Sequence, residues 1–399
     1  MELLIEFYDK DVLKNIVAPL TLRPKKVIYF YDIGMNDMLV FTALKKCLER
    51  NIPDIKLEYY PIDISSVDRI SRQIGRIIDR NSIEKCALDL TGGSELMLLA
   101  GYKAGSKLNI PLLHTDLVNK RITDLEDDSL VAKTVPLTLE DFVDAKGACF
   151  MGESHRPPSE ERFLAIKEMA RFLFKHLHQW RYTCSFLQTV AARTLPHELM
   201  MESKWNIHIK NGKAVYPDQE ILEMFQTLGF IQNLSVHGEY VRFAFNTIED
   251  RQYCISFGVW LELYVYISAK ETGVFHDAKL GTMIDWDAYD NITVAGNEID
   301  VILMDDSLPV FISCKLRDAD TAALNELLIA KKRLGGWFSK GIIVTYSKEK
   351  KIHTGTYKRA QELGLELLDA TDIMADDFGQ RLVKAIREHD LVNLKWKKI

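Results

Sequence analysis

The chain has 399 residues, and with 47% of them hydrophobic it can bury two or three cores of ordinary size. A formal net charge of −6 at pH 7 excludes a protein that coats nucleic acid through bulk charge, so any nucleic-acid contact must be focused. The 6 cysteines include no C-x-x-C pair, which argues against a structural zinc site or a disulfide framework. No apolar run approaches about 18 residues, and the acidic segment Met1–Glu6 does not resemble a signal peptide. We therefore expect a soluble, cytoplasmic protein of two or three domains.

Residues 1–138 alternate short apolar runs with amphipathic stretches, a pattern typical of a doubly wound, Rossmann-like α/β sheet. Strands are predicted at residues 3–7, 26–32, 56–61, 85–90 and 110–116, with helices at 37–50 and 67–81 between them. Ligands of such sheets bind at the carboxyl ends of the strands, so the turns there are the candidate binding residues.

The turn after the fourth strand, Asp89-Leu90-Thr91-Gly92-Gly93-Ser94, is the strongest of these candidates. Gly92 and Gly93 let the backbone approach a ligand closely, Thr91 and Ser94 offer hydroxyls, and the N–H groups of the next helix favour phosphate. The alternative is a tight turn with Ser94 as N-cap and no ligand. The turn is neither G-x-G-x-x-G nor a Walker loop, which argues against a dinucleotide site or an ATP hydrolysis site.

Two further segments are predicted to face the same cleft. Tyr31, Asp32, Ile33, Gly34 and Met35 follow the second strand. His114 lies near the end of the last strand, where a residue without a ligand contact is the simpler interpretation.

Residues 139–250 break this alternation, beginning with a predicted connector at 152–158. A helix at 218–228 and a hairpin of 230–234 with 240–245 predict a winged-helix-like module. Its basic residues are few, so a spacer role is favoured over DNA reading.

Residues 251–399 order their elements as αβββαβ: a helix at 257–269, a strand at 278–286, a hairpin of 297–304 with 308–315, a helix at 321–334 and a strand at 341–346. This order resembles the core of the PD-(D/E)XK nuclease superfamily, in which an acid ends one strand and an acid-x-Lys ends the next. The resemblance implies that Asp300 is the acid, Lys315 the lysine and Glu262 a further acid on the preceding helix.

Carboxylates that converge from adjacent strands suit a divalent ion, and hard oxygen ligands indicate Mg²⁺ or Mn²⁺. Because strand residues two apart share a face, Ser313 and Lys315 are expected to point toward Asp300, with Lys315 orienting the attacking water. A strand-end charge pair is the alternative for Asp300 and Lys315, and a solvated helix face for Glu262.

Ser313 stands where the superfamily usually has an acid. Two replacements are predicted as catalytic or metal-binding residues. Glu298 shares a strand face with Asp300, and Glu326 lies on the following helix, a position to which the acid has migrated in some superfamily members.

Over nearly its whole length the chain resembles the CRISPR-associated Rossmann-fold (CARF) nucleases of type III immunity, with the middle module matching least. The resemblance is carried by Leu3–Phe7, Asp89–Gly93, Gly258–Glu262, Glu298–Val301, Ser313–Lys315 and Leu327–Gly336. It implies a homodimer that binds a cyclic oligoadenylate, with cyclic tetra-adenylate as the expected ring, and then cleaves DNA or RNA. A ring of even symmetry suits a two-fold interface, since each protomer offers the same turn.

Two other functions stay open at this point. A ligand-responsive DNA-binding regulator with a degenerate nuclease fold is motivated by Ser313. A restriction-type nuclease whose sheet domain only dimerises is the second.

Overall fold

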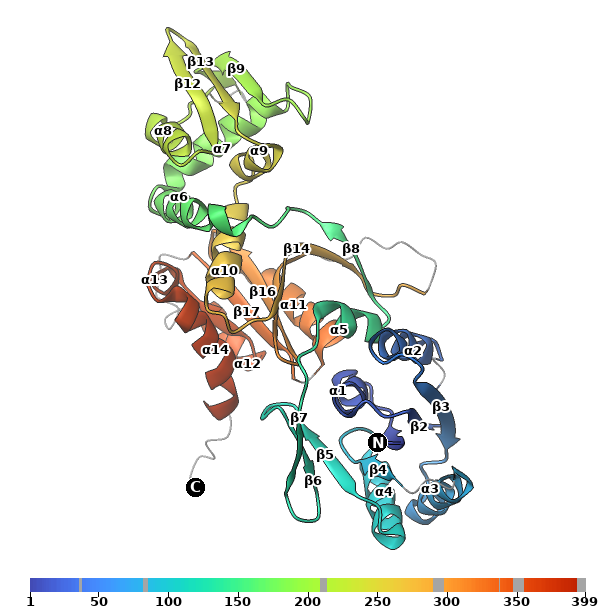
Figure 1. The fold of residues 1–399 in the computed structure, drawn as a ribbon. Coiled ribbons are helices and arrows are strands. Elements are labelled where there is room, and N and C mark those ends of the chain that lie inside the picture. The colour runs from blue at the N-terminus through green and yellow to red at the C-terminus, as the bar shows by residue number, and fades with distance from the viewer. Residues whose placement is uncertain are drawn as a thin grey trace, which may run out of the picture.

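The computed structural model describes residues 1–35, 38–81, 85–208, 214–289, 298–336, 338–346 and 355–392. Two sheets and a helix-rich module follow one another along an elongated molecule (Figure 1). Within the described ranges, none of the helices combines the length and the apolar character needed to cross a lipid bilayer.

The N-terminal sheet has the strand order β3-β2-β1-β4-β5-β6-β7. Its strands are β1 Leu3–Phe7, β2 Lys26–Asp32, β3 Lys56–Ile62, β4 Cys86–Asp89, β5 Leu112–Asp116, β6 Arg121–Asp124 and β7 Leu130–Lys133. The pairings from β3 through β5 are parallel, which confirms the predicted Rossmann-like sheet. The antiparallel hairpin of β6 and β7 extends the sheet beyond the predicted strands.

Helices cover both faces of this sheet, as the doubly wound pattern predicts. They are α1 Leu13–Leu22, α2 Leu39–Asn51, α3 Val67–Asn81 and α4 Glu95–Leu108. Buried side chains of α1 and α2 share one core with Leu4 and Tyr29, whereas those of α3 and α4 share another with Ile5 and Phe30. The alternation of inward and outward residues along β1 and β2 explains this division.

The middle module packs a three-stranded antiparallel sheet, β12-β13-β9, against helices. Its elements are a 3₁₀ turn Glu160–Arg162, α6 Phe163–Lys175, α7 Leu177–Ala191, β9 Met200–Lys204, β10 Ile207–His208, β11 Ala214–Val215, α8 Gln219–Thr227, β12 Ile231–His237, β13 Tyr240–Phe245 and α9 Ile248–Cys254. The predicted helix and hairpin are present, with β9 as an additional strand, while the winged-helix assignment stays a prediction.

The C-terminal sheet has the order β18-β17-β16-β15-β14-β8. Its elements are α10 Val259–Glu271, β14 Asp277–Asp285, β15 Glu298–Asp305, β16 Leu308–Lys315, α11 Thr321–Ala330, a π-helical turn η2 Lys331–Gly335, β17 Lys340–Thr345, α12 Gly355–Glu362, β18 Glu366–Leu368, α13 Ala370–Ile373 and α14 Phe378–Val392. The predicted order αβββαβ is present. Strand β8, Cys149–Glu153, also joins this sheet by pairing with β14, although it precedes the middle module in the chain.

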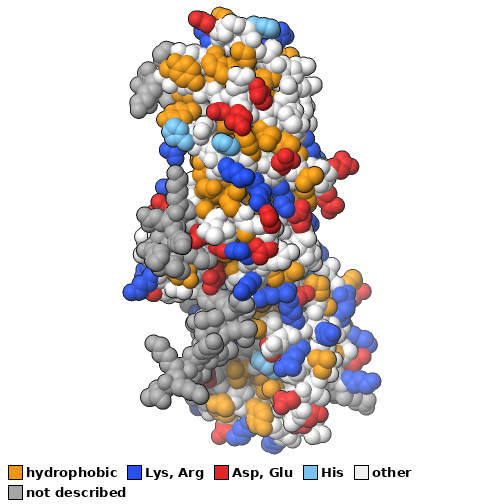
Figure 2. All heavy atoms as spheres, turned by 90° about the vertical axis from the view of Figure 1, so that its left-hand side faces the viewer, with side chains coloured by type: hydrophobic (Ala, Val, Ile, Leu, Met, Phe, Trp, Pro, Cys, Tyr) orange, Lys and Arg blue, Asp and Glu red, His pale blue; other side chains and the backbone are white. Residues whose placement is uncertain are grey.

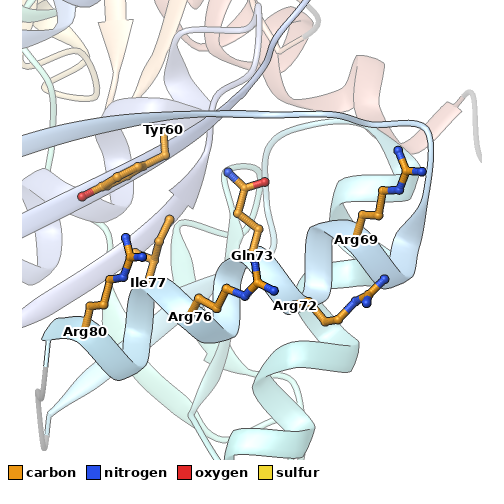
Figure 3. Close-up of a pocket in the computed structure, with 7 residues that line it drawn as sticks. All are labelled: Tyr60, Arg69, Arg72, Gln73, Arg76, Ile77 and Arg80. Atoms are coloured by element: carbon orange, nitrogen blue, oxygen red, sulfur yellow. The ribbon is translucent and has the colours of Figure 1, made fainter.

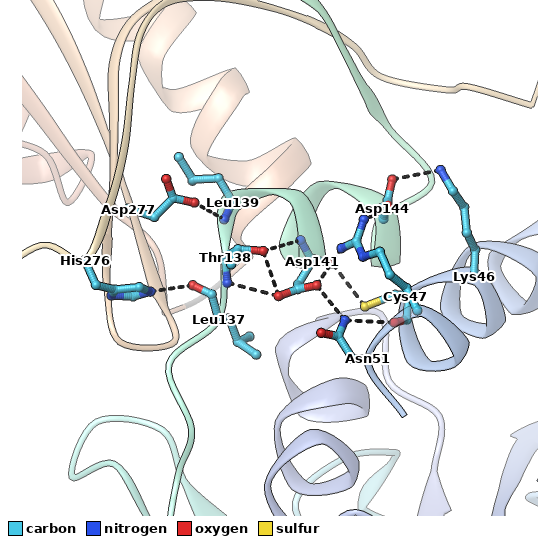
Figure 4. A network of polar contacts seen from close by, with 11 residues as sticks. Lys46, Cys47, Asn51, Leu137, Thr138, Leu139, Asp141, Asp144, His276 and Asp277 are labelled. Carbon is cyan, nitrogen blue, oxygen red and sulfur yellow. Dashed lines mark hydrogen bonds and ion pairs between the residues drawn. The ribbon is translucent and has the colours of Figure 1, made fainter. Parts of the chain in front are cut away.

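A short helix, α5 (Leu139–Ala145), joins the two sheets (Figure 4). Arg50 at the end of α2 donates to the carboxylates of Asp141 and Asp144, both on α5. The N-cap Thr138 exchanges hydrogen bonds with Asp141, which fixes the start of the helix. Helix α2 and α5 are therefore held together by charge-assisted bonds as well as by packing.

The other side of α5 contacts the start of β14 (Figure 4). The His276 ring Nε2 lies 2.7 Å from the carbonyl oxygen of Leu137, and the backbone N–H of Leu139 donates to Asp277 Oδ2 at 2.8 Å. The chain then runs from α5 directly into β8. A displacement of α2 that moves α5 can therefore reach the C-terminal sheet in two ways. One is the covalent link from α5 to β8, and the other is the pair of hydrogen bonds from Leu137 and Leu139 to the start of β14.

Candidate nuclease pocket and sensor turn

The hairpin of β15 and β16 brings Asp300, Ser313 and Lys315 together. Val301 pairs with Ile312, so Asp300 lies opposite Ser313 across the antiparallel ladder. Asp300 Oδ2 lies 3.2 Å from Ser313 Oγ and 3.5 Å from Lys315 Nζ. The backbone N–H of Cys314 donates to the same oxygen at 2.6 Å. One carboxylate oxygen thus accepts from three donors.

The carboxyl of Glu262 on α10 interacts electrostatically with Asp300 and Lys315. Burial raises its pKa to about 8, with further contributions from the negative charges of Asp300 and Glu298 and an opposing one from Lys315. The pKa of Asp300 is also raised by burial, against the lowering effects of Lys315 and of the donors on β16. The charge of Asp300 therefore opposes the ionisation of Glu262, and the charge of Glu298 opposes the ionisation of both carboxyls.

A pocket of about 410 Å³ opens beside this group. It is lined by Glu298, Ile299, Asp300, Ile312, Ser313, Lys315, Glu326, Leu327 and Ala330. Both candidate replacement acids, Glu298 and Glu326, thus reach the pocket, whereas Glu262 is not among its lining residues.

Ser154, which follows β8, holds Glu298 at the pocket. Its hydroxyl lies 3.0 Å from the carbonyl oxygen of Gly281 and donates to a carboxylate oxygen of Glu298. Gly281 has a φ of +53°, and a Cβ there would meet Ser154 Oγ at 2.2 Å, so the close approach needs glycine. Ser154 could not be predicted from the sequence, because its contact depends on β8 joining a sheet built mainly by residues more than a hundred positions later.

The donor chemistry fits a divalent cation, although no group of three or more His, Cys, Asp or Glu residues in the described ranges is arranged to hold one. Desolvated carboxyls whose pKa values are raised by neighbouring negative charges are the arrangement that a cation stabilises. The structure thus brings Asp300, Ser313 and Lys315 into contact, with Glu262, Glu298 and Glu326 around them.

The turn after β4, residues 89–94, is the candidate sensor turn, and it is held by internal hydrogen bonds. Thr91 Oγ1 donates to Asp89 and accepts from the backbone N–H of Thr115 at 2.7 Å, while Thr115 Oγ1 donates to Asp89 Oδ2 at 3.0 Å. Ser94 caps α4 by accepting from the Met97 N–H at 3.4 Å. Burial raises the pKa of Asp89 to about 6, against the lowering effect of the two threonines. The hydroxyls of Thr91 and Ser94 are therefore engaged within the turn.

Packing under the turn requires both glycines. A Cβ at Gly92 would lie 2.7 Å from the Phe7 carbonyl oxygen, and one at Gly93, whose φ is +93°, would lie 2.7 Å from Phe7 Cβ. The Gly93 N–H donates to Asp9 Oδ2 at 3.0 Å, and Lys14 Nζ lies 3.0 Å from the same oxygen. The close backbone approach that the sequence suggested for a ligand is thus also made to the loop after β1.

The other predicted ligand residues lie on either side of β1 and β4. Asp32 Oδ1 accepts from the Gly34 N–H at 2.9 Å, and the Tyr31 ring packs against Phe41 with 4.9 Å between centroids. Ile33 is exposed, and Met35 lies in the same turn. His114 is exposed on β5 next to β4.

The loop after β1 connects the sensor turn to the C-terminal domain. Asp9, which holds Gly93, also accepts from the Asp11 N–H at 2.8 Å. Asp11 is buried, and a Cβ at Gly336, just after η2, would lie 2.6 Å from its Oδ2. Lys146, next to α5, reaches the Lys10 carbonyl oxygen at 3.4 Å. Asp9 and Asp11 directly follow the first strand and can be noticed in the sequence as candidate functional residues, but only the structure shows what they contact.

Residues 249–389 match the family model of the Card1-like endonuclease domain. No curated protein matches the chain.

Two solved structures share the fold over almost their whole length. Protein VC1899 from Vibrio cholerae has a TM-score of 0.76 at 16% identity, covering 97% of this chain and 98% of that one. Can2 from Sulfobacillus thermosulfidooxidans, solved in complex with cyclic tetra-adenylate, has a TM-score of 0.70 at 16% identity, covering 97% and 99%. A type III CRISPR defence DNA nuclease activated by cyclic oligoadenylate has a TM-score of 0.54 at 14% identity, covering 96% of this chain and 51% of that one. The chain therefore shares the fold of these structures.

Proposed function

We propose that the chain is a metal-dependent nuclease of type III CRISPR defence in the cytoplasm, activated by a cyclic oligoadenylate and most simply by cyclic tetra-adenylate. The observation that carries the proposal is the contact of Asp300 with Lys315 beside a pocket in a domain of the Card1-like endonuclease family. Can2, which shares the fold, is solved with cyclic tetra-adenylate, and this supports the choice of ligand.

Asp300 and Glu262 would hold Mg²⁺ or Mn²⁺, which when bound lowers the pKa of a water and offsets charge on the scissile phosphate. Lys315 lies beside Asp300, where its ammonium can orient that water or stabilise the phosphate oxygens. Ser313 contributes a hydroxyl in place of the usual acid, and its hydrogen bond orients Asp300. We assign the remaining acid to Glu298 in preference to Glu326, because Glu298 adds to the raised pKa of Glu262 and so lies near the carboxyl pair.

Homodimerisation would place two sensor turns around one ring. Leu96, Leu99 and Tyr102 form an apolar stripe on α4, with exposed fractions of 40%, 58% and 55%. Residues three apart on a helix share a face, and α4 begins at the Ser94 cap of the sensor turn. A two-fold contact along this stripe would bring the two Thr91-Gly92-Gly93 turns near the symmetry axis, as a ring of even symmetry requires.

Signal transmission would use the contacts between the sensor turn and α5. A ligand that displaces the Gly93 N–H from Asp9 would disturb the loop that contacts Lys146 and Gly336. Movement of α5 would carry β8 with it, and Ser154 at the end of β8 holds Glu298. A shift from 1:99 to 99:1 in favour of the active state requires about 5.5 kcal/mol of preferential binding.

The test is cleavage by the purified protein in Mn²⁺ or Mg²⁺, with labelled single- and double-stranded DNA and RNA, with and without cyclic tetra-adenylate. Asp300→Ala and Lys315→Ala should each abolish ligand-stimulated cleavage while ligand binding by calorimetry is retained. Full cleavage by Asp300→Ala would show that the site is assigned wrongly.

Ser313 also supports a second function, a ligand-responsive DNA-binding regulator with a degenerate nuclease fold. In that case the natural protein would cleave nothing, and Lys315→Ala would bind a duplex sequence as well as the natural protein does. Cleavage that ignores added cyclic oligoadenylates would instead indicate a nuclease whose N-terminal sheet only dimerises.

A further inference from the structure

Helix α3 carries a row of arginines on one side. Arg69, Arg72, Arg76 and Arg80 are spaced three or four residues apart, which places neighbouring side chains about 5–6 Å apart on one helix face. The opposite face is fixed in the core through Ile70, Ile74 and Ile78, so the row cannot turn inward. Figure 3 shows the four side chains projecting side by side from the helix.

A cavity of about 490 Å³ lies along this row, beside the edge strand β3. It is lined by Tyr60, Arg69, Arg72, Gln73, Arg76, Ile77 and Arg80 (Figure 3). The Gln73 side-chain amide donates to the Pro61 carbonyl oxygen at 2.8 Å, which ties the helix to the edge strand. The cavity thus has one basic wall and one wall that carries an aromatic ring.

The carboxylates nearest the row leave most of its charge uncompensated. Glu58 forms an ion pair with Lys26 at 2.6 Å and accepts a hydrogen bond from the Tyr60 hydroxyl at 2.8 Å. Asp68 pairs with Lys103 on α4. Both carboxylates therefore form their ion pairs with lysines outside the arginine row.

Within the row itself, Asp63 reaches only Arg69, at 3.2 Å. Arg72 donates to the backbone carbonyl of Asp68 at 3.2 Å, and its charge helps to lower the pKa of the Asp68 carboxyl, but the two side chains form no ion pair. Arg76, Arg80 and the neighbouring Asp79 form no ion pair in the part of the chain that the structure describes. Three guanidinium groups thus face the cavity without an ion pair to a described carboxylate.

Such a row is unusual for this protein, whose net charge is −6. On the face shown in Figure 2, Lys and Arg side chains are interspersed with Asp and Glu. A surface that serves only solubility would show the same mixture on α3. A row of arginines without carboxylates interspersed among them therefore indicates that α3 binds an anionic ligand.

We propose that the α3 groove, formed by Tyr60 and the arginines of α3, binds the phosphodiester backbone of a single-stranded nucleic acid. Guanidinium groups recognise phosphate through paired hydrogen bonds, and a regular row of them matches a regular row of phosphates. The Tyr60 ring offers a surface on which a base can stack, as in proteins that bind single strands without reading sequence. This site goes beyond the proposed function, since it lies on the sensor domain and is separate from both the sensor turn and the nuclease pocket.

The experiment measures binding without cleavage, by fluorescence anisotropy of labelled single-stranded RNA and DNA of the same sequence in EDTA. The variant Arg72→Ala/Arg76→Ala/Arg80→Ala should bind at least 10-fold more weakly, with a salt slope lower by about 2, because each lost phosphate contact removes about 0.7 from the slope for single strands. The RNA and DNA arms show whether the 2′-hydroxyl contributes.

Two controls separate the groove from general charge. Lys45→Ala/Lys107→Ala/Lys133→Ala removes the same charge from exposed positions elsewhere on the domain and should leave affinity within about 2-fold. Tyr60→Leu should weaken binding about 10-fold, whereas Tyr60→Phe keeps the ring and should not.

Equal affinity of the arginine variant and the lysine control would overturn the proposal. Loss of cyclic tetra-adenylate binding with unchanged single-strand binding would also overturn it, by assigning the arginines to the activator. Absence of any nuclease activity in the natural protein would contradict the proposed function but not this site, because the assay contains no divalent cation.

Discussion

Replacing Glu6 by glutamine should stabilise the N-terminal domain by an amount that grows with pH. Glu6 lies in the middle of β1, is 0% exposed, and neither of its carboxylate oxygens has a hydrogen-bond partner within the described residues. Burial raises its pKa well above the ordinary value, and the charge of Asp89 raises it further. The folded protein therefore keeps Glu6 protonated under conditions in which the unfolded chain does not.

The magnitude follows from proton linkage. A group whose pKa is raised on folding contributes stability that is present below its unfolded pKa of about 4.3 and is lost as the pH rises toward the folded value. Each pH unit in that window removes about 1.4 kcal/mol from the free energy of unfolding. While the pH stays between the unfolded and the raised folded pKa of Glu6, the advantage of Glu6→Gln over the natural protein should thus grow by about 1.4 kcal/mol per pH unit. Asp89, with a pKa raised to about 6, destabilises both proteins in the same direction over that range.

Hydrogen exchange of the β1 and β2 amides, corrected for its intrinsic pH dependence, measures this stability locally in a chain of several domains. Glu6→Leu serves as a second variant, because it also removes the titrating group but leaves no buried amide. If the gain in free energy of unfolding of either variant is the same at pH 5 and pH 7, Glu6 does not have the raised pKa described, since a defect of packing alone does not depend on pH.

Three further substitutions test the route from the sensor turn to the nuclease pocket. Gly93→Ala adds a Cβ at a φ of +93° and should weaken cyclic tetra-adenylate binding at least 10-fold by calorimetry; unchanged affinity would exclude the turn as part of the ligand site. Arg50→Ala removes the two bonds from its guanidinium group on α2 to the carboxylates of α5, so ligand-stimulated cleavage should fall about 10-fold while ligand affinity stays within about 2-fold, and Lys45→Ala on the same helix is the control. Ser154→Ala frees Glu298 and should raise cleavage without ligand several-fold; unchanged basal cleavage would remove Ser154 from the switch.

Local patterns predicted the elements whose determinants are local. The strands 3–7 and 26–32 and the hairpin up to Lys315 end where the structure ends them, because apolar runs bounded by turn residues define a buried strand without reference to the rest of the fold. The same register argument placed Ser313 and Lys315 on the face of Asp300.

Local sequence patterns could not predict features that depend on the pairing of strands far apart in the chain. Strand β8 is half-exposed and short, and only its pairing with β14, more than a hundred residues later, makes it part of the nuclease sheet. The contact of Ser154 with Glu298 follows from that pairing. The burial of Glu6 in a strand that also contains Leu4 and Ile5 depends on α1 and α2 covering that face.

Activation by a cyclic oligoadenylate and catalysis at Asp300 are tested together by cleavage in Mn²⁺ with cyclic tri-, tetra- or hexa-adenylate added in turn to the natural protein and to Asp300→Ala. Cleavage by the natural protein under cyclic tetra-adenylate alone, lost in Asp300→Ala, is the predicted result. Cleavage that is equal with and without every ring, or that persists in Asp300→Ala, would contradict the account.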